Sequence, residues 1–279
     1  MKALSEVIID LRHLAGCLSG AATRQRLERE MSENRVVLIT GAATGLGAEM
    51  ARSFAAHGYR VVLNYHNNEA RADSLLEELR TLCGSARIMK YRASVENRSM
   101  VRAMYAATLD TFGQVDVLIN SAGVNRDSAF MDITDEAWDE VLASHLTGHF
   151  ICGQEYVHAN PDRDGVIINM GAAAGSIGRR NGANFCAAKA GVAVLTKCMA
   201  LELAPRIRVN CLVPGSVQTE EVIERYNLRT EQGLAKELAS LPMGRLGEYH
   251  ELTQMAHCIV NATFTTGAKF FVNGGQYMH

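Results

Sequence analysis

The sequence predicts an α/β protein built on a doubly wound parallel sheet of about seven strands. Short apolar runs alternate with helix-period segments from Arg35 onward, a glycine-rich turn follows the first run, and no proline- or serine-rich linker divides the chain. Strands that alternate with helices of this length form parallel sheets with right-handed crossovers. We therefore expect one domain over residues 34–279 and an N-terminal helical extension over residues 1–33.

The extension is predicted from helical spacing of apolar residues between Leu4 and Leu18, interrupted by charges that argue against a secretory segment. Three interpretations stay open. The helix packs on the domain or on a neighbouring subunit, it docks on another protein, or translation begins at Met31, five residues before the first strand.

The remaining elements follow from periodicity. Runs rich in Val, Ile and Leu predict buried strands, and longer segments with apolar residues three and four apart predict helices. The expected strands are Val36–Thr40, Arg60–Tyr65, Ala86–Tyr91, Val115–Asn120, Gly165–Met170, Arg208–Leu212 and Ala268–Val272. The expected helices are Ala48–Ala56, Asn68–Leu82, Ser99–Phe112, Thr134–His158, Ala183–Leu203 and a segment of mixed charge over Glu220–Leu241.

Composition excludes several function classes. A net charge of -2 gives no reason to expect nucleic acid or an anionic membrane as a partner. Seven scattered cysteines without a C-x-x-C pair favour a reducing compartment, and no apolar run approaches the ~20 residues that span a bilayer. We expect a cytoplasmic protein.

A phosphate site is predicted where the first strand meets the first helix. Gly41, Gly45 and Gly47 lie in the turn between them. Glycines let backbone N–H groups approach an anion, and the helix dipole favours negative charge there.

Four spaced motifs carry a family resemblance. They are Thr40-Gly41-x-x-x-Gly45-x-Gly47, Asn120-Ser121-Ala122-Gly123, Pro214-Gly215 with Thr219, and Gly244-Arg245-Leu246-Gly247 followed by Thr266-Gly267 and Val272-Asn273-Gly274-Gly275. From about Asn34 to its end the chain resembles the short-chain dehydrogenase/reductase (SDR) family, close to its 3-oxoacyl-[acyl-carrier-protein] reductase branch. The resemblance implies a Rossmann-like fold, a nicotinamide cofactor, an acyl-type or other small-molecule substrate, and oligomers formed through the two long helices. It also implies that Glu220–Leu241 forms a lid over the substrate.

The resemblance also implies which residues surround the cofactor. They are Gly41, Thr44, Gly45, Leu46, Gly47, Asn64, Tyr65, Ser94, Asn120, Ala122, Gly123, Lys189, Pro214, Gly215, Val217 and Thr219. An acid at the end of the second strand would hold the ribose of NAD, and none is present in Asn64-Tyr65-His66-Asn67, which favours NADP. However, Thr44 replaces the family's basic residue in the glycine turn, and Ser94 replaces its adenine-reading Asp.

The family's reaction centre is largely substituted. Its hydride transfer to a carbonyl uses a Tyr as proton donor, a Lys four residues later, a Ser and an Asn. Here Lys189 is present, but Phe185 stands at the Tyr position, Ala172 at the Ser position and His145 at the Asn position. Because phenylalanine donates no proton, efficient carbonyl reduction by the family mechanism is not expected.

Two of these residues have alternative roles. His145 is a candidate acid or base, or else packs within the helix contacts. It lies four residues from His149, a metal-compatible spacing, but no third ligand is evident and we expect no metal site. Lys189 either binds the cofactor ribose or is a low-pKa amine suited to Schiff-base chemistry.

The sequence leaves three hypotheses for the function of the protein. The leading hypothesis is a pseudo-ketoreductase that keeps the fold and the nucleotide and serves as a partner subunit of an intact SDR paralogue. The second is a biosynthetic enzyme that uses the cleft, with His145 or Lys189, for non-redox chemistry. The third is a slow NAD(P)-dependent oxidoreductase in which water replaces the Tyr hydroxyl.

Overall fold

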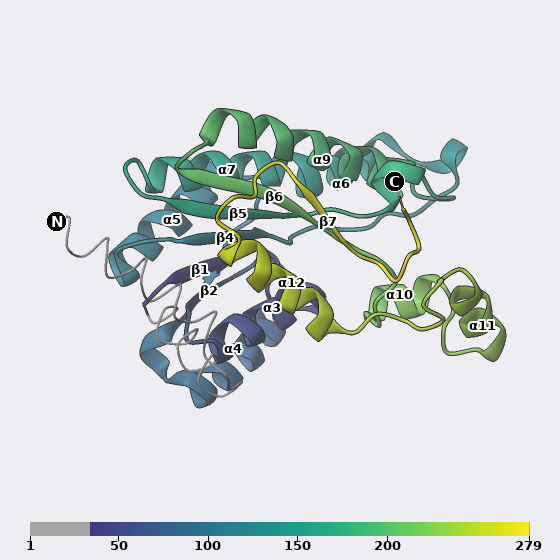
Figure 1. The fold of residues 1–279 in the computed structure, drawn as a ribbon, viewed down its shortest axis with the longest axis horizontal. Coiled ribbons are helices and arrows are strands. Elements are labelled where there is room, and N and C mark those ends of the chain that lie inside the picture. The colour runs from purple at the N-terminus through teal and green to yellow at the C-terminus, as the bar shows by residue number, and fades with distance from the viewer. Residues whose placement is uncertain (1–33, 279) are drawn as a thin grey trace.

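A seven-stranded parallel sheet forms the centre of the computed structural model, which describes residues 34–278 (Figure 1). The extension predicted for residues 1–33 lies outside the described residues. The strand order is β3-β2-β1-β4-β5-β6-β7. The strands are β1 (Val36–Ile39), β2 (Arg60–Tyr65), β3 (Ile88–Arg92), β4 (Val117–Asn120), β5 (Gly165–Met170), β6 (Ile207–Pro214) and β7 (Lys269–Val272).

This order confirms the predicted doubly wound sheet. The chain builds outward from β1 to β3, then returns to place β4 on the other side of β1. Loops leaving the carboxyl ends of β1 and β4 therefore diverge to opposite faces, which opens a crevice between them.

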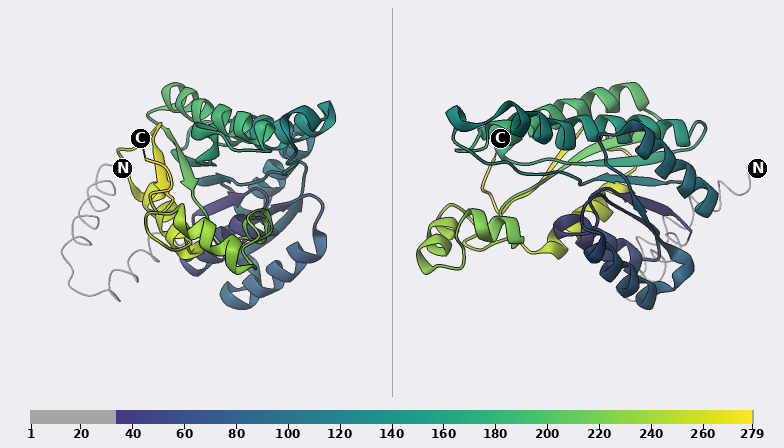
Figure 2. Two further views of the ribbon diagram at one scale, coloured as in Figure 1. Left: turned by 90° about the vertical axis from the view of Figure 1, so that its right-hand side faces the viewer. Right: turned by 180° about the vertical axis from the view of Figure 1, so that it is seen from behind.

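Helices cover both faces of the sheet, as the two views of Figure 2 show. One face carries α3 (Gly45–Ala56), α4 (Glu69–Cys83) and α12 (Tyr249–Asn261), and the other carries α5 (Arg98–Phe112), α6 (Asp135–Leu142), α7 (Gly148–Ala159) and α9 (Ala183–Leu203). Short helical turns are η1 (Ser85–Arg87), η2 (Phe130–Asp132) and α8 (Ala174–Ile177).

Each face has its own apolar core, because successive strand residues point to opposite sides. In β1, Val37 and Ile39 pack with the residues of α3, α4 and α12, whereas Val36 and Leu38 pack with those of α5 and α7. All four are fully buried. The continuous apolar run of β1 is thus explained by burial on both sides.

Side-chain caps fix where several helices begin. The side chains of Asn68, Asn97 and Thr134 each accept a hydrogen bond from the backbone N–H three residues later. At the other end of α5, Gly113 ends the helix at a φ of 75°, in the left-handed region that glycine adopts freely.

The predicted helix over Thr134–His158 is a helical run from Asp135 to Ala159 that contains one π-helical turn. A wide turn with π-type hydrogen bonding, η3 (Ala143–Thr147), separates α6 from α7 and contains His145. Such turns interrupt helical periodicity without a proline or glycine signal and are frequent at functional sites. This is why the apolar pattern alone predicted one long helix.

The predicted lid is also two helices, α10 (Glu220–Arg225) and α11 (Glu231–Ala239), which project beyond the sheet on the side of the C-terminal strand ends (Figure 1). Leu228 and Leu241 of this segment form a small apolar cluster with Leu246, which follows it. None of the helices within residues 34–278 is long and apolar enough to cross a membrane.

Candidate nucleotide and substrate cleft

A cleft of about 610 Å³ lies at the carboxyl ends of the strands. It runs from the glycine turn after β1 to α10 and takes in most of the predicted site residues. These are Gly41, Thr44, Gly45, Leu46, Gly47, Ala122, Gly123, His145, Ala172, Phe185, Lys189, Pro214, Gly215, Val217 and Thr219. Its volume and position are typical of ligand sites in open α/β sheets.

Close backbone packing explains the glycine turn. Gly41 has a φ of 66°, and a Cβ there would lie 2.7 Å from the Ala122 Cα atom. A Cβ on Gly47 would lie 2.4 Å from the Gly41 carbonyl oxygen. The first residues of α3, whose N-cap residue Thr44 forms no capping side-chain hydrogen bond, therefore face the cleft with their N–H groups.

Four predicted cofactor residues lie beneath the cleft and not in its wall: Asn64, Tyr65, Ser94 and Asn120 are all buried. The Asn64 side-chain oxygen accepts a hydrogen bond of 3.3 Å from the Gly41 N–H, so Asn64 supports the glycine turn. The Tyr65 hydroxyl donates to Glu69 at 2.9 Å, and the Asn120 amide donates to Asn169 at 2.9 Å.

Lys189 and Phe185 meet at the base of the cleft. The buried Lys189 ammonium donates to the Met170 carbonyl at 2.6 Å and lies 5.8 Å from the centre of the Phe185 ring. Burial lowers the pKa of Lys189 to about 8. Ala172, in the turn after β5, contributes only a methyl group to the same wall.

His145 packs edge-to-face on Phe185, with ring centres 5.1 Å apart. Its Nε2 lies 2.9 Å from the Val124 carbonyl oxygen, which only accepts, so Nε2 carries the proton. Nδ1 is then a bare acceptor, and no described residue hydrogen-bonds to it. Burial, together with the charge of Lys189, lowers the pKa of His145 well below its ordinary value, which makes the ring neutral.

Space for this imidazole comes from Gly123. A Cβ on Gly123 would lie 1.9 Å from the His145 ring. Gly123, which is predicted to face the cofactor, therefore also leaves room for His145, the residue predicted at the position of the family's Asn.

The second histidine of the pair is buried too. Burial, followed by the charges of Lys189 and His145, lowers the pKa of His149 well below its ordinary value, while a hydrogen bond to the Asn120 backbone acts in the opposite direction. Within residues 34–278 no group of three or more His, Cys, Asp and Glu side chains is arranged to hold a metal ion.

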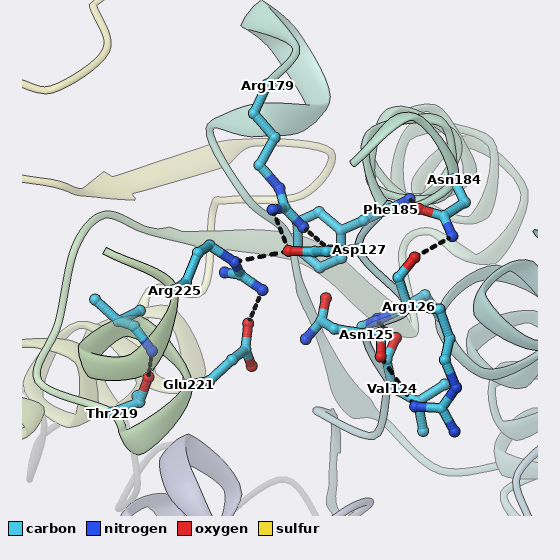
Figure 3. Close-up of polar contacts among 12 residues, drawn as sticks. Val124, Asn125, Arg126, Asp127, Arg179, Asn184, Phe185, Thr219, Glu221 and Arg225 are labelled. Carbon is cyan, nitrogen blue, oxygen red and sulfur yellow. Dashed lines mark hydrogen bonds and ion pairs between the residues drawn. The ribbon is translucent and has the colours of Figure 1, made fainter. Parts of the chain in front are cut away.

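The sequence analysis missed an ion-pair cluster at the substrate end, shown in Figure 3. Asp127 accepts two hydrogen bonds of 2.6 Å from Arg179 and one of 2.9 Å from Arg225, which also pairs with Glu221. Burial alone would raise the pKa of Asp127, but the two arginines outweigh it and hold that pKa below its ordinary value. These residues come from three separate connections, so no local pattern predicted their meeting.

Arg71, on the first turn of α4, was also missed. It lines the nucleotide end of the cleft, and no described residue pairs with its guanidinium group. Its neighbours Glu69 and Asp73 are instead paired with Lys90.

Comparisons with known proteins identify the family of this chain. The short chain dehydrogenase family model matches residues 35–228. The 3-oxoacyl-[acyl-carrier-protein] reductase FabG of Staphylococcus aureus is 33% identical over 255 residues, covering 89% of this chain and all of the relative. The corresponding reductase of Synechocystis is 35% identical over 249 residues, covering 88% and 97%.

A solved structure shows the same fold. The short-chain dehydrogenase/reductase of Brucella melitensis described as a glucose/ribitol dehydrogenase matches with a TM-score of 0.81 and 28% identity, over 88% of this chain and 98% of that one. The chain therefore belongs to the short-chain dehydrogenase/reductase family. Within it, the chain lies in the branch that resembles the 3-oxoacyl-[acyl-carrier-protein] reductases.

Proposed function

We propose that this protein binds a nicotinamide nucleotide, does not reduce carbonyls by the hydroxyl mechanism of its family, and serves as a pseudo-ketoreductase partner of an active SDR paralogue. The Phe185 ring beside Lys189 carries this proposal. A ring without a hydroxyl cannot supply the general acid, typically worth ~10²–10⁴-fold in rate. Ala172 likewise offers no hydrogen bond to a developing oxyanion, typically worth ~10²–10³-fold.

The cleft suits a dinucleotide. The turn that holds Gly41, Gly45 and Gly47 leaves no side chain between backbone N–H groups and a pyrophosphate, and α3 begins directly behind it. When bound, the nicotinamide supplies a hydride. The residues of this chain that would hold the nucleotide are this turn, Ala122, Pro214 and Thr219.

NADP is the cofactor that the charges favour. The wall of the cleft contains no acid from the end of β2, where one would hold the ribose of NAD. Of the lining cations, Lys189 is bonded to a carbonyl and Arg179 and Arg225 are paired with Asp127. Arg71 keeps its guanidinium group available for a 2′-phosphate.

We expect Arg71→Gln to weaken NADPH binding about tenfold and to leave NADH binding unchanged, because one charge-assisted hydrogen bond is lost only with the 2′-phosphate. Cofactor fluorescence titration of the full chain measures both affinities. Arg80→Gln, in the last turn of α4 and outside the cleft wall, is the control. Absence of any NADPH binding up to millimolar concentration would contradict the nucleotide proposal itself.

The partner role is supported by apolar side chains on the outer helices. Phe150 on α7 and Val194 and Leu201 on α9 are exposed, Leu201 at 84%. Clustered exposed apolar groups mark association surfaces, and we propose that these two helices pack against another SDR subunit. In the described chain Cys83, Cys152, Cys186, Cys198, Cys211 and Cys258 are free thiols, which supports a cytoplasmic location.

Co-expression with an intact 3-oxoacyl reductase of the same organism tests this role. We expect a mixed oligomer by affinity capture and light scattering, with reductase activity carried by the partner alone. Leu201→Glu should abolish the mixed oligomer while the chain stays folded. Recovery of homo-oligomers alone from such cells would contradict the partner proposal.

A second candidate function rests on His145. Its unpartnered Nδ1 acceptor and its place in the cleft wall suit it to accept a proton or hydrogen bond from a ligand in non-redox chemistry. Loss of turnover in His145→Ala with the fold retained would favour this function over the partner role.

A further inference from the structure

We propose that Asp127, Arg179 and Arg225 form a gate across the substrate end of the cleft, in which Arg179 covers the face of Phe185 and Arg225 fastens α10 over it. The gate lies in the same cleft as the proposed function, but it requires no bound nucleotide. It admits a ligand to Lys189 across the Phe185 ring only when these ion pairs separate.

Phe185, Asp127 and Gly182 together form the binding place of the Arg179 side chain. Its guanidinium carbon lies 4.8 Å from the centre of the Phe185 ring, a cation–π distance. Both terminal nitrogens donate to the Asp127 carboxylate. A Cβ on Gly182 would lie 2.7 Å from the guanidinium carbon and from Nε, so the absence of a side chain at Gly182 leaves the room that the arginine fills.

Arg225 connects the lid to Asp127, the residue that also binds Arg179. The α10–α11 segment has its own apolar cluster, so it can move as a unit. It is attached to the β6 side of the cleft by Glu237, which accepts hydrogen bonds from Ser216 and Gln276. Asp127 follows β4, two strands away, and Arg225 reaches it across the cleft, as Figure 3 shows.

The charges of this ion-pair cluster make it a barrier to a ligand and do not attract one. Two arginines face Asp127 and Glu221, so the cluster carries no net charge that would draw in an anionic ligand. Arg179 and Arg225 keep only 13% and 18% of their side-chain surface exposed. A ligand that approaches Lys189 over Phe185 must therefore displace paired, largely desolvated guanidinium groups.

Hydrogen exchange of the α10 amides, measured by mass spectrometry on the nucleotide-free full chain, tests the gate. Arg225→Gln and Asp127→Asn should each speed this exchange on the order of tenfold, the second from a position outside α10. Glu221→Gln removes only the pair between Glu221 and Arg225 within α10 and should leave the rate within about twofold. If Asp127→Asn changed amide exchange only in the loop after β4 and left the exchange of α10 unchanged, the gate would be overturned.

Salt provides a second measurement, made on the natural protein and on Arg225→Gln. Raising NaCl from roughly 0.05 to 0.5 M shortens the Debye length, but these pairs are largely buried, so α10 exchange in the natural protein should accelerate by less than the substitutions accelerate it. The same salt step should have no effect in Arg225→Gln. Equal salt responses in both proteins would overturn the gate. A failed NADPH titration would contradict the nucleotide proposal but not the gate, so the two inferences can be tested separately.

Discussion

At the scale of single residues, Phe185 gives the cleft wall an aromatic ring without a hydroxyl group. The ring lies between the Arg179 guanidinium, the Lys189 ammonium and the His145 imidazole. An aromatic face attracts cations without a hydroxyl group. The Arg179 and Lys189 cations can therefore stay beside this ring although the ring itself donates no proton.

Restoring that donor is a direct experiment. We expect the double variant Phe185→Tyr, Ala172→Ser to reduce a 3-oxoacyl thioester with NADPH about 10²-fold faster than the natural chain or more, because Lys189 already lies below the ring. Initial rates followed by NADPH absorbance measure the gain. Adding Lys189→Ala to the double variant should remove it, and a rate no higher than the natural chain would contradict the account of the substitutions.

The contact of Gly123 with His145 gives a second prediction. Gly123→Ala should lower the free energy of unfolding by about 1–3 kcal/mol, because its Cβ would collide with the buried imidazole. In a His145→Ala background the same change should cost much less. Urea unfolding of the four proteins gives the coupling energy, and additive effects would show that the two residues do not compete for this space.

At the scale of elements, α3 and α12 meet through a group of rings. His257 of α12 stacks on Phe54 of α3 at 4.2 Å and on His57 at 4.1 Å, and its Nε2 lies 3.0 Å from the Ser53 hydroxyl. Burial, with a smaller effect of His57, lowers the pKa of His257 to about 3. The contact therefore depends on a neutral imidazole.

Stability should fall as this contact is acidified. An unfolded histidine takes up its proton near pH 6.5 and the folded His257 only near pH 3, so the unfolded state binds more protons between these values. The free energy of unfolding should drop by at most about 1.4 kcal/mol for each pH unit below 6.5. Urea unfolding at several pH values should show a shallower slope in His257→Phe, and an unchanged slope in His250→Gln, whose imidazole is exposed. Identical slopes in the natural protein and His257→Phe would rule out this proton linkage.

At the scale of the whole molecule, the parallel sheet brings distant connections to one edge. The loops after β1, β4, β5 and β6 all leave from the carboxyl ends of neighbouring strands. This explains how Gly41, Asp127, Arg179 and Arg225 line or border one cleft although they are spread over much of the chain. Such a site combines a nucleotide end, fixed by backbone geometry, with a substrate end made from loops.

Local sequence patterns accounted for most of the fold. The strand and helix ranges were close because their apolar residues follow regular periods, and the glycine turn was predictable because backbone approach requires residues without side chains. The π-helical turn at Ala143–Thr147 and the division of the lid at Arg225 were not predicted, since neither carries a local signal as strong as proline.

The sequence by itself determined the doubly wound sheet and the family, because these depend on periodicity and on fixed motif spacing, and it predicted which side chains form the reaction centre. Tertiary structure alone decided that Asn64 supports the glycine turn, that Gly123 makes room for His145, and that Arg179 and Arg225 converge on Asp127. These contacts join residues far apart in the chain, and their partners are chosen by which loops the sheet places side by side.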